Sequence, residues 1–205
     1  MSKFFKKNNK LNRGFTLVET LVAISIFTVS LIGIMSVLAS GIADTTYAKQ
    51  KMTATYLAQE GIEYMRNMRD TGVLYDPSGA QTGWSTFKSQ FIPSYQCTQN
   101  SKCGFSKLSG ILPYSVSSCS SLNSCKLFIG GDGLYDSNNA YDSNNASGTD
   151  SGFTRIIWMT KADGSSGSFT NASNNEVRIY SQVSWTQGSG SKSVILFEDL
   201  FNWVE

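Results

Sequence analysis

The residues with the clearest chemical potential lie near the N-terminus, where Gly14 is followed by Phe15 and where Glu19 precedes an uncharged run from Thr20 to Ala43. A charged residue at the centre of a membrane helix costs roughly 2.5 to 3.5 kcal/mol, and less near its end. Glu19 therefore needs a partner. Cleavage between Gly14 and Phe15 would create an α-amino group about one helical turn from the carboxylate, and the amine of a neighbouring subunit could pair with it.

The segment that follows Glu19 has the composition of a membrane-spanning helix. About 20 apolar residues cross the hydrocarbon core of a bilayer, and the run from Thr20 to Ala43 meets that length. Its N-terminal flank holds no acidic residue and five basic ones: Lys3, Lys6, Lys7, Lys10 and Arg13. Such a flank stays in the cytoplasm and directs the C-terminal part outside.

Two simpler explanations compete for this N-terminus. An ordinary secretory signal could be cleaved at Ala39-Ser40-Gly41, but its apolar core is usually shorter. A plain membrane anchor explains the length of the run, yet it leaves Glu19 and the Gly14-Phe15 junction unexplained.

The basic flank, the Gly14-Phe15 junction and Glu19 together resemble the class III signal sequence of type IV pilins and pseudopilins, with its prepilin-type cleavage and methylation motif. The resemblance implies that a membrane aspartyl peptidase cuts after Gly14 and then N-methylates Phe15. It also implies that Glu19, the fifth residue of the processed chain, registers subunits during assembly. The partners that it implies are other pilin subunits, the prepilin peptidase and methyltransferase, the membrane and the pilus assembly platform.

Segments beyond the apolar run resemble minor pilins in particular. They are 56–61 and 66–70, followed in the last part of the chain by 153–155, 183–186 and 202–203. Many major pilins have a proline in the N-terminal helix where this chain has Ser36. We therefore expect a minor pilin of the assembly or modification kind. The alternatives are a type II secretion pseudopilin and a filament-tip adhesin or DNA-uptake subunit.

A helical pattern continues beyond the apolar run, with no proline until Pro77. Residues three to four apart share one face of a helix, and the apolar or small residues at this spacing are Ala48, Met52, Thr55, Ala58 or Gln59, Ile62 and Met65. We expect the helix to run to about Asp70. It should end near Gly72, because glycine readily adopts a left-handed cap.

The head is predicted to be built from strands. From Val177 to Thr186 apolar and polar residues alternate, which is typical of a strand with one buried face. A Gly-Ser turn over 187–192 precedes a second strand over 193–201, and shorter strands are expected over 153–161 and 126–129. A hairpin is marginal without further strands or a helix to cover it, so we expect an antiparallel sheet packed against the outer half of the helix.

The predicted fold class is thus α+β: a long N-terminal helix, with a transmembrane half and an amphipathic half, packed on a C-terminal antiparallel head. The expected parts are a cleaved cytoplasmic leader (1–14), a transmembrane or filament-core helix (15–43), its amphipathic continuation (44–71) and a globular head (72–205). Before assembly the chain should cross the cytoplasmic membrane once with its head outside. Afterwards it should lie in an extracellular pilus or a periplasmic pseudopilus.

Four cysteines in the head form two pairs of equal spacing: Cys97 with Cys103, and Cys119 with Cys125. An even number of cysteines in an exported domain implies disulfides, and four allow three connectivities. Local pairing is favoured because each bond would close a short polar loop. A four-thiolate zinc site is the alternative, but its cysteine pairs are usually separated by two to four residues.

An acidic and amide-rich repeat lies between the cysteines and the last strands. Residues 135–140 are repeated as 141–146, and the oxygen ligands to consider for calcium are Asp132, Asp136 and Asp142. Calcium loops need acids or amides at alternate positions, and Ala140 and Ala146 occupy places where a third ligand belongs. We expect a solvated surface loop, with calcium binding as the alternative.

Composition argues against catalysis and against nucleic-acid binding. The chain has no histidine, which removes the commonest general base, and neither a phosphate-binding loop nor a nucleophile elbow occurs. Five of the 17 basic residues belong to the leader, so the processed form carries 12 basic against 15 acidic residues. Affinity for polyanions needs clustered Lys and Arg, and the remaining ones are scattered. We expect no enzyme activity and no cofactor.

Overall fold

The computed structural model describes residues 14–91, 97–105, 116–119, 125–131, 133–136, 148–163 and 175–203. The chain divides into two compact units, Met1–Thr46 and Tyr47–Glu205. The long helix α1 (Leu17–Tyr75) contributes to both of them.

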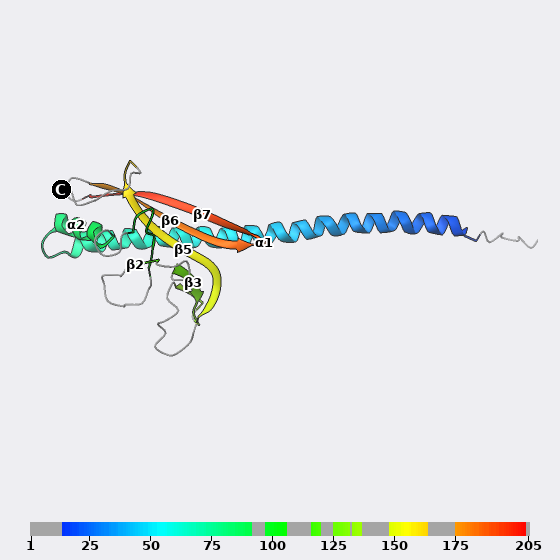
Figure 1. Ribbon diagram of the computed structural model, residues 1–205, viewed down its shortest axis with the longest axis horizontal. Coiled ribbons are helices and arrows are strands. Elements are labelled where there is room, and N and C mark those ends of the chain that lie inside the picture. The colour runs from blue at the N-terminus through cyan, green and yellow to red at the C-terminus, as the bar shows by residue number, and fades with distance from the viewer. Residues whose placement is uncertain are drawn as a thin grey trace, which may run out of the picture. The chain divides into compact units, whose positions relative to one another are not determined.

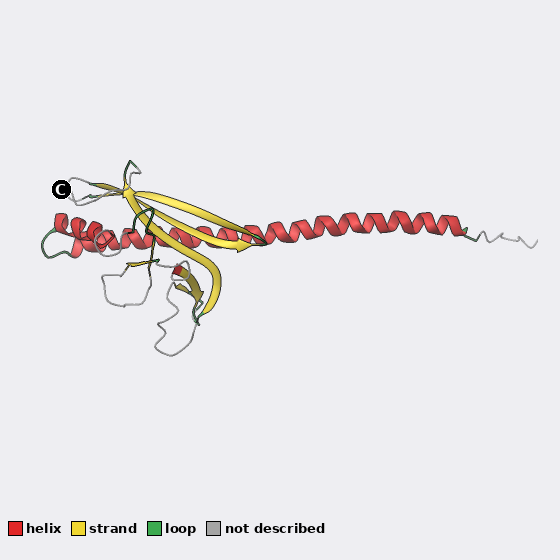
Figure 2. Ribbon diagram, viewed as in Figure 1, coloured by secondary structure: helices red, strands yellow, loops and turns green. Residues whose placement is uncertain are grey.

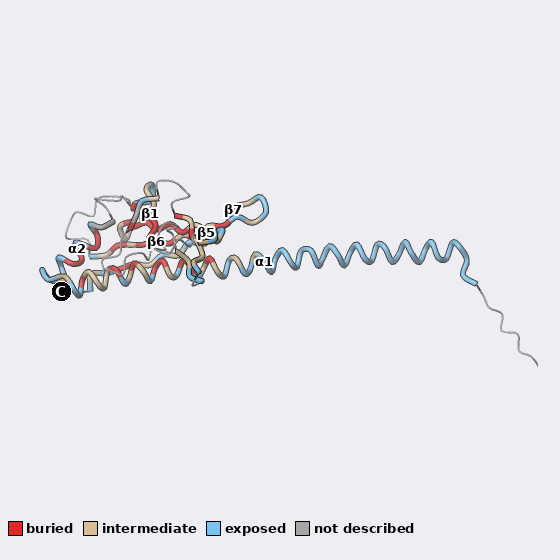
Figure 3. The backbone as a smooth tube through the Cα atoms, turned by 90° about the horizontal axis from the view of Figure 1, so that it is seen from below, coloured by how far each residue is buried: buried red, intermediate tan, exposed pale blue. Residues whose placement is uncertain are grey.

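In the first unit, every described residue from Gly14 to Thr46 is exposed, as the pale blue part of α1 in Figure 3 shows. This part of α1 is long enough and apolar enough to cross a membrane. Its hydroxyl groups donate hydrogen bonds to backbone carbonyls three or four residues earlier, at 2.8 to 3.1 Å, from Thr20, Ser25, Thr28, Ser30 and Ser40. The side chains therefore satisfy these polar groups within the helix itself.

In the second unit, α1 buries one stripe of side chains against the sheet, shown in red in Figure 3. The buried residues follow the helical period and are Ala54, Leu57, Ala58, Gly61, Ile62, Met65, Met68 and Val73. The predicted stripe is correct from Ala58 onward and wrong at its start, because Ala48 and Met52 are exposed.

Helix α1 ends at Tyr75, so the predicted end near Gly72 is wrong. The break comes one residue before Asp76, whose conformation is restricted by Pro77, and Ser78 N donates to Asp76 Oδ1 at 2.8 Å. Gly79, with a φ of 99°, supplies the left-handed conformation instead. Gly72 stays helical.

A second helix, α2 (Ala80–Phe91), follows this turn and was not predicted. Its buried aromatic residues are Trp84 and Phe87, which lie with ring centroids 5.6 Å apart. They join the larger cluster of the core with Met65 and Met68 of α1. The helix thus closes the end of the core that lies beside the last turns of α1.

The head is a seven-stranded sheet in which every pairing is antiparallel. Figure 2 shows its strands in yellow beside α1. The strands are β1 (Cys103–Phe105), β2 (Val116–Ser118), β3 (Lys126–Ile129), β4 (Tyr135–Asp136), β5 (Thr149–Lys161), β6 (Glu176–Gln187) and β7 (Gly190–Phe201). Strand β5 is central: β6 and β7 follow on one side of it, and β1 and β3 pair with its other side.

The four predicted strands are confirmed as β3, β5, β6 and β7, and so is the helix-on-sheet α+β fold. Alternation on β6 buries Val177, Ile179, Val183 and Trp185, as expected for a half-buried strand. Tyr135 and Asp136, which were predicted to belong to a loop, form the short strand β4 instead.

Candidate functional site

The Gly14-Phe15 junction is exposed and lies ahead of the helix. Residues Gly14 to Thr16 have no regular secondary structure, α1 begins at Leu17, and the side chain of Phe15 is 80% exposed. A Cβ atom built at Gly14 would meet no atom within 4 Å. The peptide bond between Gly14 and Phe15 is therefore sterically open to a peptidase.

The first turn of α1 is closed by a cap that the sequence analysis missed. Glu19 N donates a hydrogen bond to Thr16 Oγ1 at 3.3 Å, and Thr20 N donates to Thr16 O at 3.2 Å. Thr16 is thus the N-cap and Glu19 occupies the third helical position, which is the spacing of a capping box. The pattern Thr-x-x-Glu was visible in the sequence and could have revealed it.

This arrangement gives Glu19 a favourable local environment. The free N–H groups at a helix N-terminus carry a partial positive charge, which stabilises an acidic side chain in the first turn. The carboxylate is also the last charged group before the uncharged run that ends at Ala43. Glu19 thus lies at the third position of the helix, where its N–H is bonded to Thr16, and at the edge of the apolar segment.

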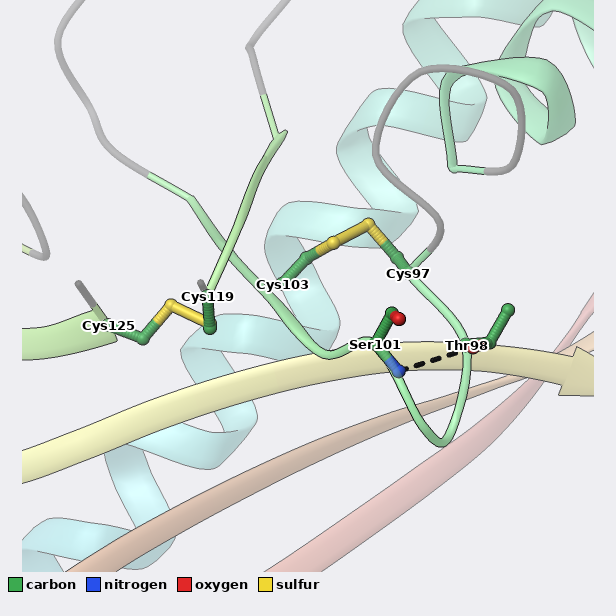
Figure 4. Close-up of a disulfide and its surroundings, with 6 residues drawn as sticks. All are labelled: Cys97, Thr98, Ser101, Cys103, Cys119 and Cys125. Carbon is green, nitrogen blue, oxygen red and sulfur yellow. Dashed lines mark hydrogen bonds between the residues drawn. A yellow bond between two sulfur atoms is a disulfide. The ribbon is translucent and has the colours of Figure 1, made fainter. Parts of the chain in front are cut away.

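The cysteines of the head form two local disulfides, drawn in Figure 4: Cys97 with Cys103, and Cys119 with Cys125. This is the pairing that the spacing favoured. All four sulfurs are therefore bonded in pairs, so the four-thiolate zinc alternative is wrong.

The two disulfides lie close together because β1 and β2 bring them side by side. Cys103 pairs with Ser118 in the sheet, and Cys119 N donates to Lys102 O at 2.9 Å. Cys97 is tied to the central strand, since Met159 N donates to Cys97 O at 3.0 Å. The two disulfides and these backbone hydrogen bonds together attach short loops and very short strands to β5.

The calcium alternative receives no support from the described part of the chain. Asp136 is half-buried on β4, whereas Asp132 and Asp142 lie outside the described residues. Within those residues, no group of three acidic, cysteine or histidine side chains is placed to hold a metal ion.

Comparison with known proteins identifies the N-terminal segment. The prokaryotic N-terminal methylation motif matches residues 9–35. No curated protein and no solved structure matches the chain. The chain therefore carries the N-terminal methylation motif of the type IV pilin and pseudopilin family, on a pilin-like fold of one long helix and an antiparallel sheet.

Proposed function

We propose that this protein is a minor pilin, a subunit of a type IV pilus or a related filament. The membrane peptidase cuts after Gly14, Phe15 becomes the methylated N-terminus, and the apolar part of α1 holds the subunit in the membrane until assembly. The observation that carries the proposal is the methylation motif over 9–35, placed on a helix whose residues 17–46 are all exposed. Such an apolar surface requires either lipid or other helices to cover it.

In this proposal, Glu19 sets the axial position of each incoming subunit relative to its neighbour. The amine of Phe15 in an incoming subunit pairs with Glu19 of a subunit already in place, and a charge-assisted hydrogen bond of this kind is strong in an apolar surrounding. A subunit in the wrong axial position would leave the carboxylate unpaired, which is costly away from water.

Any contribution of the Glu19 side chain to the helix cap must be separated from its charge, and two substitutions do so. Glu19→Gln keeps a side chain that serves in a capping box but removes the charge, whereas Glu19→Ala removes both. We expect both variants to accumulate in the membrane and to be poorly incorporated into sheared filaments. Asp44→Ala is the matched control, since Asp44 is also an exposed acidic residue of α1 but lies beyond the apolar run. Normal incorporation of Glu19→Gln would show that the cap, and not the ion pair, is what assembly requires.

A pseudopilin of a type II secretion system would use the same leader and helix. N-terminal sequencing and intact mass of the protein from membranes and from sheared surface material distinguish the two. N-methylated Phe15 in sheared fibres supports a pilus subunit, and the same species confined to the cell envelope supports a pseudopilus. A chain beginning near Gly41 or retaining Met1 would contradict pilin processing.

A filament-tip adhesin or DNA-uptake subunit is the further alternative, with residues 97–152 as the contact surface. The two disulfide-closed loops favour it, because surface loops on a rigid scaffold commonly carry binding residues. Deleting residues 135–146 tests this alternative. Loss of cell or DNA binding with unchanged filament incorporation supports it.

A further inference from the structure

The head contains a polar pocket that no motif in the sequence indicated. It lies where β5 separates from β6. The two strands pair from Lys161 and Val177 as far as Phe153 and Trp185, and β6 then continues to Gln187 with its pairing to β7 alone among the described strands. Figure 1 shows β5 curving away from β6 towards β3. The pocket at this fork has a volume of about 260 Å³.

A bulge in β5 creates the fork. Between the paired positions Lys126–Thr154 and Phe128–Asp150, β5 contains more residues than β3 does. Gly152, with a φ of 76°, makes the bend, and its N–H donates to Asp150 Oδ1 at 2.9 Å. Bulges of this kind re-aim side chains and are common next to functional sites. Here the bulge places Asp150 beside the hydroxyl-bearing residues of β5 and β6.

The lining of the pocket is rich in hydroxyl groups. Four of them come from three different strands, namely Thr154, Ser184, Thr186 and Ser191. None of these hydroxyls makes a side-chain hydrogen bond to the rest of the protein where the structure describes it. Each can therefore both donate and accept a hydrogen bond with a ligand.

The charges of the pocket cancel. Lys126 Nζ lies 3.2 Å from Asp150 Oδ2 at the rim, with the two side chains 39% and 48% exposed. Trp185 completes the lining and is its only aromatic residue among those that the structure describes. A single ion pair surrounded by hydroxyls gives no excess of positive charge, so the pocket does not favour phosphate or nucleic acid, which are bound by unpaired cations.

We propose that this pocket binds one neutral sugar ring of a glycan. A sugar presents several hydroxyls that both donate and accept, which matches the four hydroxyls and the paired charges of the lining. The volume is below the roughly 300 to 1,000 Å³ of pockets for drug-sized ligands, so the site suits one ring rather than a long oligosaccharide. The described lining residues belong to β3, β5, β6 and β7, and Trp185 also packs against Tyr47 of α1. None of them belongs to the apolar part of α1 that carries Glu19, so binding and assembly use different residues.

The test uses the full chain in detergent micelles and saturation-transfer NMR with glucose, galactose, mannose and N-acetylglucosamine as probes. We expect saturable binding of at least one sugar, with a dissociation constant on the order of 1 mM, because a ligand with so few atoms has a low maximal affinity. Thr154→Val and Ser184→Ala should each weaken binding about tenfold, and Thr154→Ser should restore it. Ser193→Ala is the matched control, since Ser193 pairs with Ser184 in the sheet but does not line the pocket.

Three results would overturn the proposal. No saturable binding of any of the four sugars would show that the pocket is only a feature of the sheet. Binding that is equally weakened by Ser193→Ala would place the ligand elsewhere. Tight binding of inorganic phosphate that Lys126→Ala abolishes would show that the site takes anions. Because all these measurements use isolated protein, failure of the sugar site would leave the filament role of Glu19 untouched.

Discussion

The guanidinium of Arg155 on β5 donates a hydrogen bond from Nη1 to Glu60 Oε2 of α1 at 2.7 Å, and the Arg155 side chain is only 2% exposed. The same Nη1 donates to Leu57 O at 3.3 Å, and the guanidinium carbon lies 4.0 Å from the centre of the Phe105 ring. Burial lowers the pKa of Arg155, and Glu60 opposes that shift. One ion pair thus joins the helix to the central strand of the sheet.

Removing the carboxylate of this pair should destabilise the head. Glu60→Gln leaves a buried guanidinium without its counter-charge, which costs about 3 to 5 kcal/mol when both partners are buried. We expect about 2 kcal/mol here, because the Glu60 side chain is 35% exposed. Urea unfolding of the full chain in detergent, followed by tryptophan fluorescence, measures the change.

The control for this substitution lies on the same helix. Glu63→Gln removes an exposed pair with Arg66, whose side chains are 67% and 39% exposed, so the loss should stay below about 1 kcal/mol. Equal effects of the Glu60 and Glu63 substitutions would contradict the structural role of the buried pair.

Two glycines face each other where α2 crosses the end of α1, and their substitution by alanine should have opposite results. A Cβ on Gly83 would clash with the carbonyl oxygen of Gly72 and would lie 2.9 Å from Val73 Cα, so only backbone movement could make room. We expect Gly83→Ala to cost about 1 to 3 kcal/mol. A Cβ on Gly72 would lie 3.5 Å from Gly83 O, an ordinary contact. Gly72→Ala should be neutral or stabilise by about 0.5 to 1 kcal/mol, because alanine is the better helix former.

Thermal unfolding of the two single variants in the same detergent checks this asymmetry. A similar loss of stability in both would show that the glycines serve chain flexibility and not the close approach of the two helices.

The outer face of the β6–β7 hairpin should make stability depend on acid pH. Arg178 donates two hydrogen bonds to Asp199, at 2.6 and 2.8 Å, and this lowers the pKa of Asp199 below its usual value of 3.8. A carboxyl with a depressed folded-state pKa stabilises the fold above its unfolded pKa. That contribution disappears as the pH falls through the folded pKa. We expect the wild-type chain to lose stability more steeply below about pH 4 than Asp199→Asn does.

Arg178→Gln should flatten the same pH dependence, because no cation then holds the pKa of Asp199 down. Urea midpoints measured from pH 6 down to pH 2 report the slopes. Unchanged slopes in both variants would assign the acid sensitivity to other carboxylates.

The elements that could be predicted best from the sequence are those whose apolar residues recur at a regular spacing. Strand β6 alternates along most of its length and the outer part of α1 repeats every three to four residues, so the type of both elements followed directly. Strand β7 was expected from the Gly-Ser turn before it, whereas β5 is buried at every residue from 155 to 160 and has no such alternation. Strands β1, β2 and β4 have only two or three residues, which is too short for any period to appear. They depend on β5 and on the disulfides for their position.

Tertiary contacts explain the errors at the helix ends. Helix α2 contains Gly83, which lowers its local helix preference, and packing against Gly72 together with burial of Trp84 and Phe87 stabilises it instead. That same contact keeps Gly72 helical. At the other end of the buried stripe, Ala48 and Met52 have the right spacing, but it is Tyr47 that packs against Trp185 there, and the first fully buried residue of α1 is Ala54. For the N-terminal segment, the Gly14-Phe15 junction and Glu19 were recognisable from residue type alone, whereas the Thr16 cap was overlooked.

The hydroxyl groups in the apolar part of α1 allow this segment to be surrounded either by lipid or by other helices. Thr20, Ser25, Thr28, Ser30 and Ser40 all donate to carbonyls of their own helix. The segment carries its hydrogen-bond partners with it when it moves from lipid into a bundle of helices. None of these five donors has to find a new acceptor on that move, so in the proposed filament role the free-energy difference between the two locations comes mainly from close packing of side chains and from Glu19. In the proposed filament role, the same segment can therefore be covered first by lipid and then by other helices without any change in these internal hydrogen bonds.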